Sequence, residues 1–237
     1  MPIVEGSRAT ERVGGRLSDL RGAAADRLIA ISQIVTVPAG RPVMMEGAPA
    51  TNLFGVTQGI VSIFKLMPDG RRQITGFLYP GSFLGVTFNA ATTYAYGADA
   101  VTAVALRAYP RRDLERLLDE VPGVRRAFIA AMADELTEAQ DRMLLLAHRS
   151  ASERLACFLL TLARRQAGPG GEPVDSVFVP MRGSDIADYL GLTAETVSRT
   201  LAVFRRKGIV RAERGGSIAI LDHSALEALA GPLSRRL

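Results

Sequence analysis

Residues 183–202, which read GSDIADYLGLTAETVSRTLA, constrain the fold more than any other part of the chain. Ala187, the fifth residue of this window, is small enough to let two helices cross closely. Gly191, the ninth, accepts the positive φ of a tight turn. The pattern predicts a helix-turn-helix. Its inner apolar face is expected to consist of Ile186, Leu190, Leu192, Val197, Leu201 and Phe204.

The second helix of this motif has a polar outer face. Thr193 is placed to cap the helix, and Glu195, Ser198 and Arg199 then face outward together with Ala194. An arginine can donate two hydrogen bonds to guanine, a glutamate can accept one from cytosine, and a serine can contact a thymine edge. We therefore predict that Glu195, Ser198 and Arg199 read bases, against the plainer alternative of a surface Glu–Arg pair.

A wing is predicted directly after the motif. The chain reads IVRAE, then Arg-Gly-Gly, then SIAIL, which indicates two short strands around a turn. The whole chain has a net charge of +5, and positive charge is most concentrated in its C-terminal part, which fits a polyanionic partner. The residues expected to contact phosphate and position the motif are Arg182, Ser184, Thr193, Thr196, Arg205, Arg206, Lys207 and Arg214.

The N-terminal half has a different sequence pattern. Short alternating runs separated by glycine and proline predict strands of a compact antiparallel β roll. The runs lie at 34–37, 52–57, 60–66, 73–78 and 100–109. Pro68-Asp69-Gly70 predicts a hairpin between two of them, because proline presets φ and glycine accepts a positive φ.

A long helix is predicted from Pro122 to about Ala147. Its apolar residues alternate at spacings of three and four, which is typical of a coiled-coil seam. One interpretation is a helix packed on its own domain, and the other is a seam between two copies of the chain. The residues predicted for this dimer interface are Ile129, Met132, Leu136, Ala139, Met143 and Leu146. Ser150 and Glu153 form a candidate capping box that starts the next helix.

Several classes of protein are excluded by composition. The one cysteine, Cys157, rules out an internal disulfide framework, a four-cysteine zinc site and an iron–sulfur cluster, and we expect it to be a small buried side chain. No apolar run approaches the length of a membrane span, and the N-terminus lacks an export signal. We found no nucleophile–base pair, phosphate loop or metal-ligand set. The expectation is a soluble, cytoplasmic protein that is not an enzyme and holds no metal.

The order β roll, heptad helix, winged helix-turn-helix over residues 30–225 resembles the Crp/Fnr superfamily of transcription regulators. The match is closest in PMRGSDIADYLGLTAETVSRTLAVFRRKGIV. The string from Glu195 to Arg199 resembles the Fnr/FixK subgroup, whose glutamate and arginine read a G·C pair while the serine reads a neighbouring T·A pair. This resemblance implies sites of the type TTGAT-N4-ATCAA. Ala194 departs from the cyclic-AMP receptor branch, which usually has arginine there, and Gly183 stands where relatives often carry a phosphate-binding arginine.

The sensor half departs further from the cyclic-nucleotide binders. Those proteins place a glutamate for the ribose and an arginine for the cyclic phosphate, where this chain has Val86 and Tyr96. A buried phosphate without a cation is costly, so we expect no cyclic nucleotide. The resemblance then implies a FixK-like regulator without a cofactor. Two alternatives stay open: a ligand- or haem-dependent sensor of the same fold, and a β-roll interaction module without specific DNA binding.

The expected fold is thus α+β, with a β roll over 1–120, a dimerisation helix over 121–149 and a winged helix-turn-helix over 150–237. The expected function is that of a homodimeric activator that binds double-stranded DNA and contacts RNA polymerase. In such a dimer the two reading helices lie about 34 Å apart, in successive major grooves.

Overall fold

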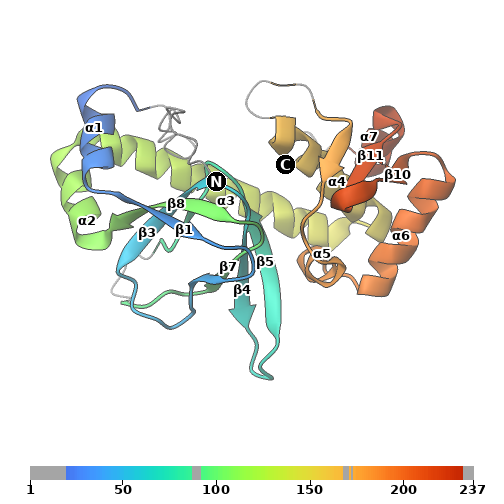
Figure 1. Cartoon of the computed structure of the whole chain (residues 1–237), viewed down its shortest axis with the longest axis horizontal. Helices are drawn as coiled ribbons and strands as arrows, with labels where there is room; N and C mark the ends of the chain where they lie inside the picture. Colours follow the sequence, from blue (N-terminus) through green and yellow to red (C-terminus); the bar gives the residue numbers. More distant parts are fainter. Residues whose placement is uncertain (1–19, 87–91, 168–170, 172, 232–237) are drawn as a thin grey trace, which may run out of the picture. The chain divides into compact units, whose positions relative to one another are not determined.

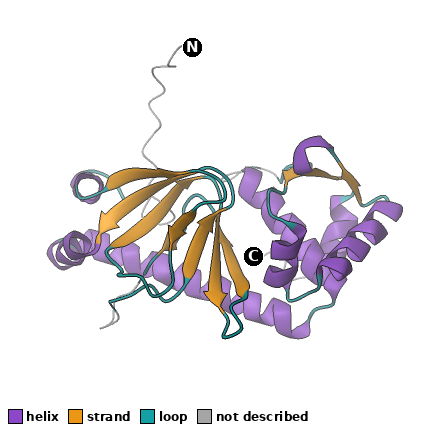
Figure 2. Cartoon of the chain, turned by 60° about the horizontal axis from the view of Figure 1, so that its bottom comes forward, coloured by secondary structure: helices purple, strands orange, loops and turns teal. Residues whose placement is uncertain are grey.

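The structure is a computed structural model that describes residues 20–86, 92–167, 171 and 173–231. It confirms the predicted α+β fold, and Figures 1 and 2 show how helices and strands follow one another along the chain. The helices are α1 (Ala23–Ala30), α2 (Arg111–Glu120), α3 (Pro122–His148), α4 (Ala151–Ala167), α5 (Gly183–Leu190), α6 (Ala194–Arg206) and α7 (His223–Ala230). The strands are β1 (Gln33–Val37), β2 (Pro42–Met44), β3 (Asn52–Gln58), β4 (Val61–Leu66), β5 (Arg72–Leu78), β6 (Phe83–Leu84), β7 (Gly97–Ala100), β8 (Val104–Pro110), β9 (Ser176–Phe178), β10 (Val210–Ala212) and β11 (Ser217–Ile220).

The strands form three sheets, with the orders β1-β8-β3-β6, β2-β7-β4-β5 and β10-β11-β9. The prediction of a single strand over 100–109 is wrong. The chain turns at 101–103, so β7 ends at Ala100 and β8 begins at Val104. There the Thr102 hydroxyl accepts a hydrogen bond from the Ile60 amide at 2.9 Å, while the Val101 amide donates to the Ile60 carbonyl at 2.8 Å. The predicted hairpin is confirmed, with Gly70 at φ 82°.

Packing divides the chain into two compact units that are discontinuous in sequence. The first contains the described residues up to Ser62 and Phe77–Met132, and the second contains Ile63–Gly76 with the described residues from Ala133 onward. The distal part of the β4–β5 hairpin and the second half of α3 therefore belong to the same unit as α5 and α6. The predicted domains, 1–120, 121–149 and 150–237, are continuous in sequence and stay a prediction. In the described part of the chain, no helix has the length and apolar character needed to cross a bilayer.

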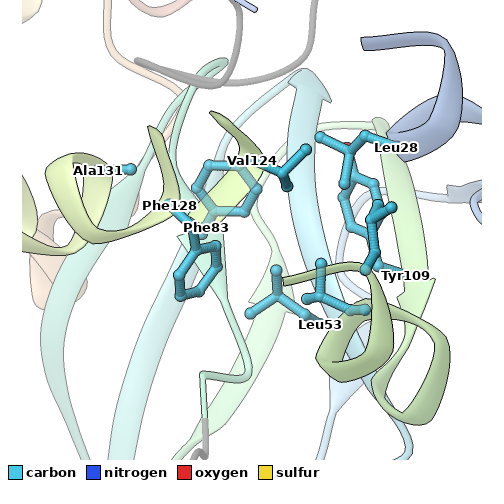
Figure 3. Packing of buried hydrophobic residues seen from close by; sticks show 9 residues of the cluster. Leu28, Leu53, Phe83, Tyr109, Val124, Phe128 and Ala131 are labelled. Carbon is cyan, nitrogen blue, oxygen red and sulfur yellow. The ribbon is translucent and has the colours of Figure 1, made fainter. Parts of the chain in front are cut away.

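The first unit has a core where helices α1, α2 and α3 meet strands β3, β6 and β8, shown in Figure 3. Phe83 of β6 and Phe128 of α3 lie with ring centroids 6.4 Å apart, a separation at which tilted rings attract. The buried members of this core are Leu28, Leu53, Phe83, Tyr109, Leu114, Leu117, Val124, Phe128 and Ala131. Met132, predicted as a dimer-interface residue, packs against the same core and is half-buried.

Tyr109 gives a test of this core. Its side chain is 1% exposed, and its hydroxyl has no hydrogen-bond partner within the described ranges. Because a buried hydroxyl without a partner costs about 1–3 kcal/mol, Tyr109→Phe is expected to leave the free energy of unfolding unchanged or to raise it. The measurement is the urea midpoint at constant m value. Tyr94→Phe is the control, since the Tyr94 hydroxyl donates to the Asn52 carbonyl at 2.9 Å, and this variant is expected to lose stability. Equal losses in both variants would contradict the argument.

Candidate nucleic-acid interface

The predicted helix-turn-helix is formed by α5 and α6. Gly191 ends α5 in the left-handed conformation, with φ 61°, where residues with a side chain are strained. The Leu192 amide then donates to the Ala187 carbonyl at 2.9 Å, which closes the turn. The predicted inner residues Ile186, Leu190, Val197 and Phe204 are buried, and Leu192 and Leu201 are half-buried.

Helix α6 begins with a side-chain cap, as predicted. The Thr193 hydroxyl accepts from the Thr196 amide at 3.1 Å. Thr200 is buried on the inner side, where an aliphatic residue is more usual, and its hydroxyl donates to the Thr196 carbonyl at 2.8 Å. This bond within the helix satisfies the polar group, so the inner face packs as an apolar surface.

The outer face of α6 brings together the three predicted base-reading residues. Glu195, Ser198 and Arg199 are all exposed on the side opposite to Val197 and Thr200. The side chains of Arg199 and Glu195 are 78% and 69% exposed and form an ion pair one helical turn apart. Exposed pairs of this kind contribute little to stability. The pair instead presents a planar donor and an acceptor side by side, which is the arrangement that a G·C pair requires.

The residues predicted to contact phosphate lie in α5, α6 and the wing turn, or directly beside the two helices. Seven of them are exposed: Arg182, Ser184, Thr193, Arg205, Arg206, Lys207 and Arg214. Thr196 is half-buried, and its hydroxyl lies 2.9 Å from that of Thr193. Helix α5 starts directly after Arg182 without a side-chain cap, so this cation lies at a helix N-terminus, where anions are favoured.

The wing is confirmed as the antiparallel pair β10 and β11, and β9 adds a third strand that the sequence did not predict. At its edge the Ser176 hydroxyl donates to the Glu213 carboxylate at 2.6 Å, and Arg211 lies 3.4 Å from the same carboxylate. The Ser176 bond and then Arg211 hold the pKa of Glu213 below its usual value. Arg214 lies in the turn between the two predicted wing strands.

The β4–β5 hairpin also contacts the motif, which the sequence pattern did not indicate. Gln73 of β5 donates from its side-chain amide to the Asp188 carbonyl of α5 at 2.9 Å. Arg142 of α3 donates to the Thr75 carbonyl at 2.6 Å, and its guanidinium lies 5.4 Å from the Tyr189 ring centroid, a cation–π contact. The end of α5 is therefore braced by residues far away in sequence.

The predicted capping box at the start of α4 is confirmed. The Ser150 amide donates to the Glu153 carboxylate at 2.8 Å, and the Glu153 amide donates to the Ser150 hydroxyl at 3.3 Å. The Ser150 amide and then the Arg149 guanidinium lower the pKa of Glu153 from about 4.5 to about 2. Further along α4, Cys157 is 1% exposed, as predicted, and burial raises the pKa of its thiol.

The capping box predicts a pH-dependent contribution to stability. Because the folded state favours the Glu153 carboxylate, its stabilisation is complete above about pH 4.5 and is lost as the pH falls towards about 2. Glu153→Gln is expected to cost about 0.5–2 kcal/mol at neutral pH, the range for losing a helix cap. Urea unfolding of both proteins at a series of pH values checks this. A gap between them that stays constant from neutral pH to pH 3 would contradict the assignment.

Comparison with known proteins finds a matching family profile for each half of the chain. The family profile described as a Crp-like helix-turn-helix domain matches residues 153–229, and that of the cyclic nucleotide-binding domain matches residues 34–121. The nitrogen fixation regulation protein FixK of Bradyrhizobium diazoefficiens is 41% identical over 191 residues, covering 81% of this chain and 79% of that protein. The chain belongs to the Crp/Fnr family of transcription regulators.

Within the Crp/Fnr family, the chain lies among the FixK-like members. The transcriptional activatory protein AadR of Rhodopseudomonas palustris is 38% identical over 78% of this chain and 76% of its own length. The structure of FixK2 from Bradyrhizobium japonicum superposes with a TM-score of 0.76 at 33% identity, covering 85% of this chain and 98% of that one. The resemblance first indicated by the string from Glu195 to Arg199 is thereby confirmed.

Membership of the Crp/Fnr family raises the question of a cyclic nucleotide in the β roll. The residues present do not fit one. Tyr96, at the position expected for the phosphate-binding cation, accepts a hydrogen bond from the Gly85 amide at 3.0 Å, so it occupies a donor that an anion would need. A Cβ at Gly85 would lie 3.0 Å from the buried Tyr94 ring. Val86, at the glutamate position, is half-buried and offers no acceptor.

Proposed function

We propose that this Crp/Fnr protein is a homodimeric activator that reads TTGAT-N4-ATCAA-like sites and needs neither a cyclic nucleotide nor an iron–sulfur cluster. The observation that carries the proposal is the exposed group of Glu195, Ser198 and Arg199 on one face of α6. A FixK-like activator also needs to recruit RNA polymerase, which is the second partner that we propose. Since its relatives are named as transcription regulators, we propose no enzymatic activity.

Support for the dimer comes from the surface of α3. Ile129, Leu136 and Met143 lie seven residues apart and are 60%, 60% and 69% exposed. Large apolar side chains exposed at heptad spacing indicate a partner helix. The other predicted interface residues, Met132, Ala139 and Leu146, are half-buried within the chain itself. The proposed seam is therefore centred on the three exposed residues.

Support for independence from a cyclic nucleotide comes from the β roll. Tyr94 and Tyr96 satisfy their hydroxyls on backbone groups of Asn52 and Gly85. The backbone groups that these hydroxyls bond are therefore already engaged within the roll. We infer that the folded roll is competent without a ligand.

The test is fluorescence anisotropy of the purified protein with no added ligand, at one stated salt concentration. The two duplexes carry TTGAT-N4-ATCAA and a scrambled sequence of the same composition. Tight binding to the first, by at least about 10³-fold over the second, is expected of a specific regulator. Weak and equal binding to both would contradict the proposal. Selectivity that emerges only with added nucleotide or haem would instead favour the sensor of the same fold.

A further inference from the structure

A single arginine from α4 holds the turn of the helix-turn-helix. Arg154 donates from its guanidinium to four backbone carbonyls. Nη1 bonds to the carbonyls of Leu190 at 2.8 Å and Gly191 at 3.3 Å, at the C-terminal end of α5. Nη2 bonds to the carbonyl of Leu146 at 2.7 Å and Nε to that of Arg149 at 2.9 Å, at the C-terminal end of α3 and just beyond it.

The chemistry of these contacts explains why an arginine stands there. The last carbonyls of a helix lack partners within the helix, and the helix dipole makes that end partly negative. Two such ends, those of α3 and α5, meet at Arg154. A guanidinium is planar, always charged and rich in donors, so it satisfies both ends at once. A lysine is a point charge and cannot reproduce this geometry.

The joint is also tightly packed. A Cβ at Gly191 would lie 3.2 Å from Nη1 of Arg154 and 3.5 Å from Cδ2 of Leu146. The turn therefore lies directly against Arg154 and the last turn of α3, and a side chain at Gly191 would require the Arg154 guanidinium to shift by a few tenths of an ångström. The recognition helix α6 starts three residues later and packs against α5, so its position follows from that of the turn.

We propose that Arg154 is a positioning residue that fixes α6 relative to α3 and thereby sets the half-site spacing that the dimer accepts. The inference rests on the proposed function, because spacing matters only when two copies joined through α3 bind two half-sites. One additional base pair between the half-sites increases their separation by about 3.4 Å and rotates one relative to the other by about 34°. A rigid joint rejects such a change, and a loosened joint tolerates it.

The experiment measures affinity for three duplexes with identical half-sites and spacers of three, four and five base pairs. The proteins are wild type, Arg154→Met and Arg154→Lys, compared at one salt concentration, with thermal melts in parallel. Wild type is expected to favour the four-base-pair spacer strongly. In Arg154→Met this preference is expected to fall by at least about tenfold, since the hydrogen bonds of a charged donor are lost. Discrimination against a swapped G·C pair within a half-site is expected to stay unchanged, because the reading face of α6 is intact.

Arg165→Met is the matched control. Arg165 also belongs to α4, and its Nη2 pairs with Oε1 of Glu138 on α3 at 2.7 Å. The substitution therefore removes an arginine that links α4 to α3, while the bonds of Arg154 to the turn stay in place. Its spacer preference is expected to equal that of wild type.

The outcomes separate the possibilities. If Arg154→Met weakens binding to all three duplexes by the same factor, Arg154 has only a structural role and the inference is overturned. If Arg154→Met is unfolded at the assay temperature, Arg154→Lys decides by the same criterion, with a smaller expected change in spacer preference. If wild type selects the operator but every variant keeps the wild-type preference, the inference alone fails. If wild type does not select the operator over scrambled DNA, the proposed function fails and the inference fails with it.

Discussion

Leu136→Lys is expected to convert the protein to a monomer and to weaken operator binding by about 10²–10⁴-fold, the range over which joining two sites raises affinity. Leu136 is 60% exposed, so the substitution leaves the fold of the chain intact. In a dimer through α3 it would bring two positive charges into the apolar seam. The added positive charge by itself would strengthen binding to the DNA phosphates. A loss of affinity therefore cannot be explained by the charge and indicates loss of the dimer. Light scattering after gel filtration gives the mass, and anisotropy gives the affinity.

Thr137→Lys is the matched control for this experiment. It adds the same charge one residue further along α3, about 100° around the helix. Thr137 is exposed, and its hydroxyl donates to the Ala133 carbonyl of the same helix at 2.9 Å. This variant is expected to stay dimeric and to bind as wild type does. A Leu136→Lys protein that is still a dimer would place the interface elsewhere.

Arg199→Ala is expected to cost about 1–3 kcal/mol on the specific site and to flatten discrimination at one G·C pair. Arg199 is highly exposed and its ion pair with Glu195 is solvated, so the fold is expected to lose little stability. The effect should therefore appear in DNA binding and not in the melting temperature. The measurement is a set of affinities for operators in which each base pair of a half-site is changed in turn.

Arg205→Ala serves as the contrasting variant. Arg205 is exposed in the last turn of α6, and we place it on phosphate. The Arg205→Ala variant is expected to bind all DNA sequences more weakly by the same factor. The slope of log affinity against log salt concentration is expected to fall by about one. If Arg199→Ala behaves in this uniform way as well, its assignment to base reading is wrong.

Local patterns predicted most of the fold because they need only neighbouring residues. The capping box at Ser150, the hairpin at Gly70 and the long helix from Pro122 all follow from short stretches of sequence. Strands β2 and β6 were missed because two or three residues are too few for an alternation to be seen. The sequence of the run at 100–109 does not reveal the break between β7 and β8, because its apolar residues continue through the turn at Thr102.

The exposed face of α6 was predictable for the same reason, since the turn at Gly191 sets its register. The seam on α3 stays a prediction. A heptad pattern shows which residues share a side of a helix, but it does not show which of them the chain covers itself. Met132 packs into its own core and Leu146 lies beside Gly191. The role of Arg154 could not be predicted, because the carbonyls that meet at it come from separate elements of the chain.

The bond between Gln73 and Asp188 joins residues 115 positions apart. During synthesis at about 5–20 residues per second, the β4–β5 hairpin waits for several seconds or more before its partner in α5 exists. The second unit, which contains the helix-turn-helix, can therefore finish folding only after nearly the whole chain has been made. A nascent or truncated chain that ends before α5 leaves the side-chain amide of Gln73 without this acceptor, and it has no recognition helix with which to engage a promoter.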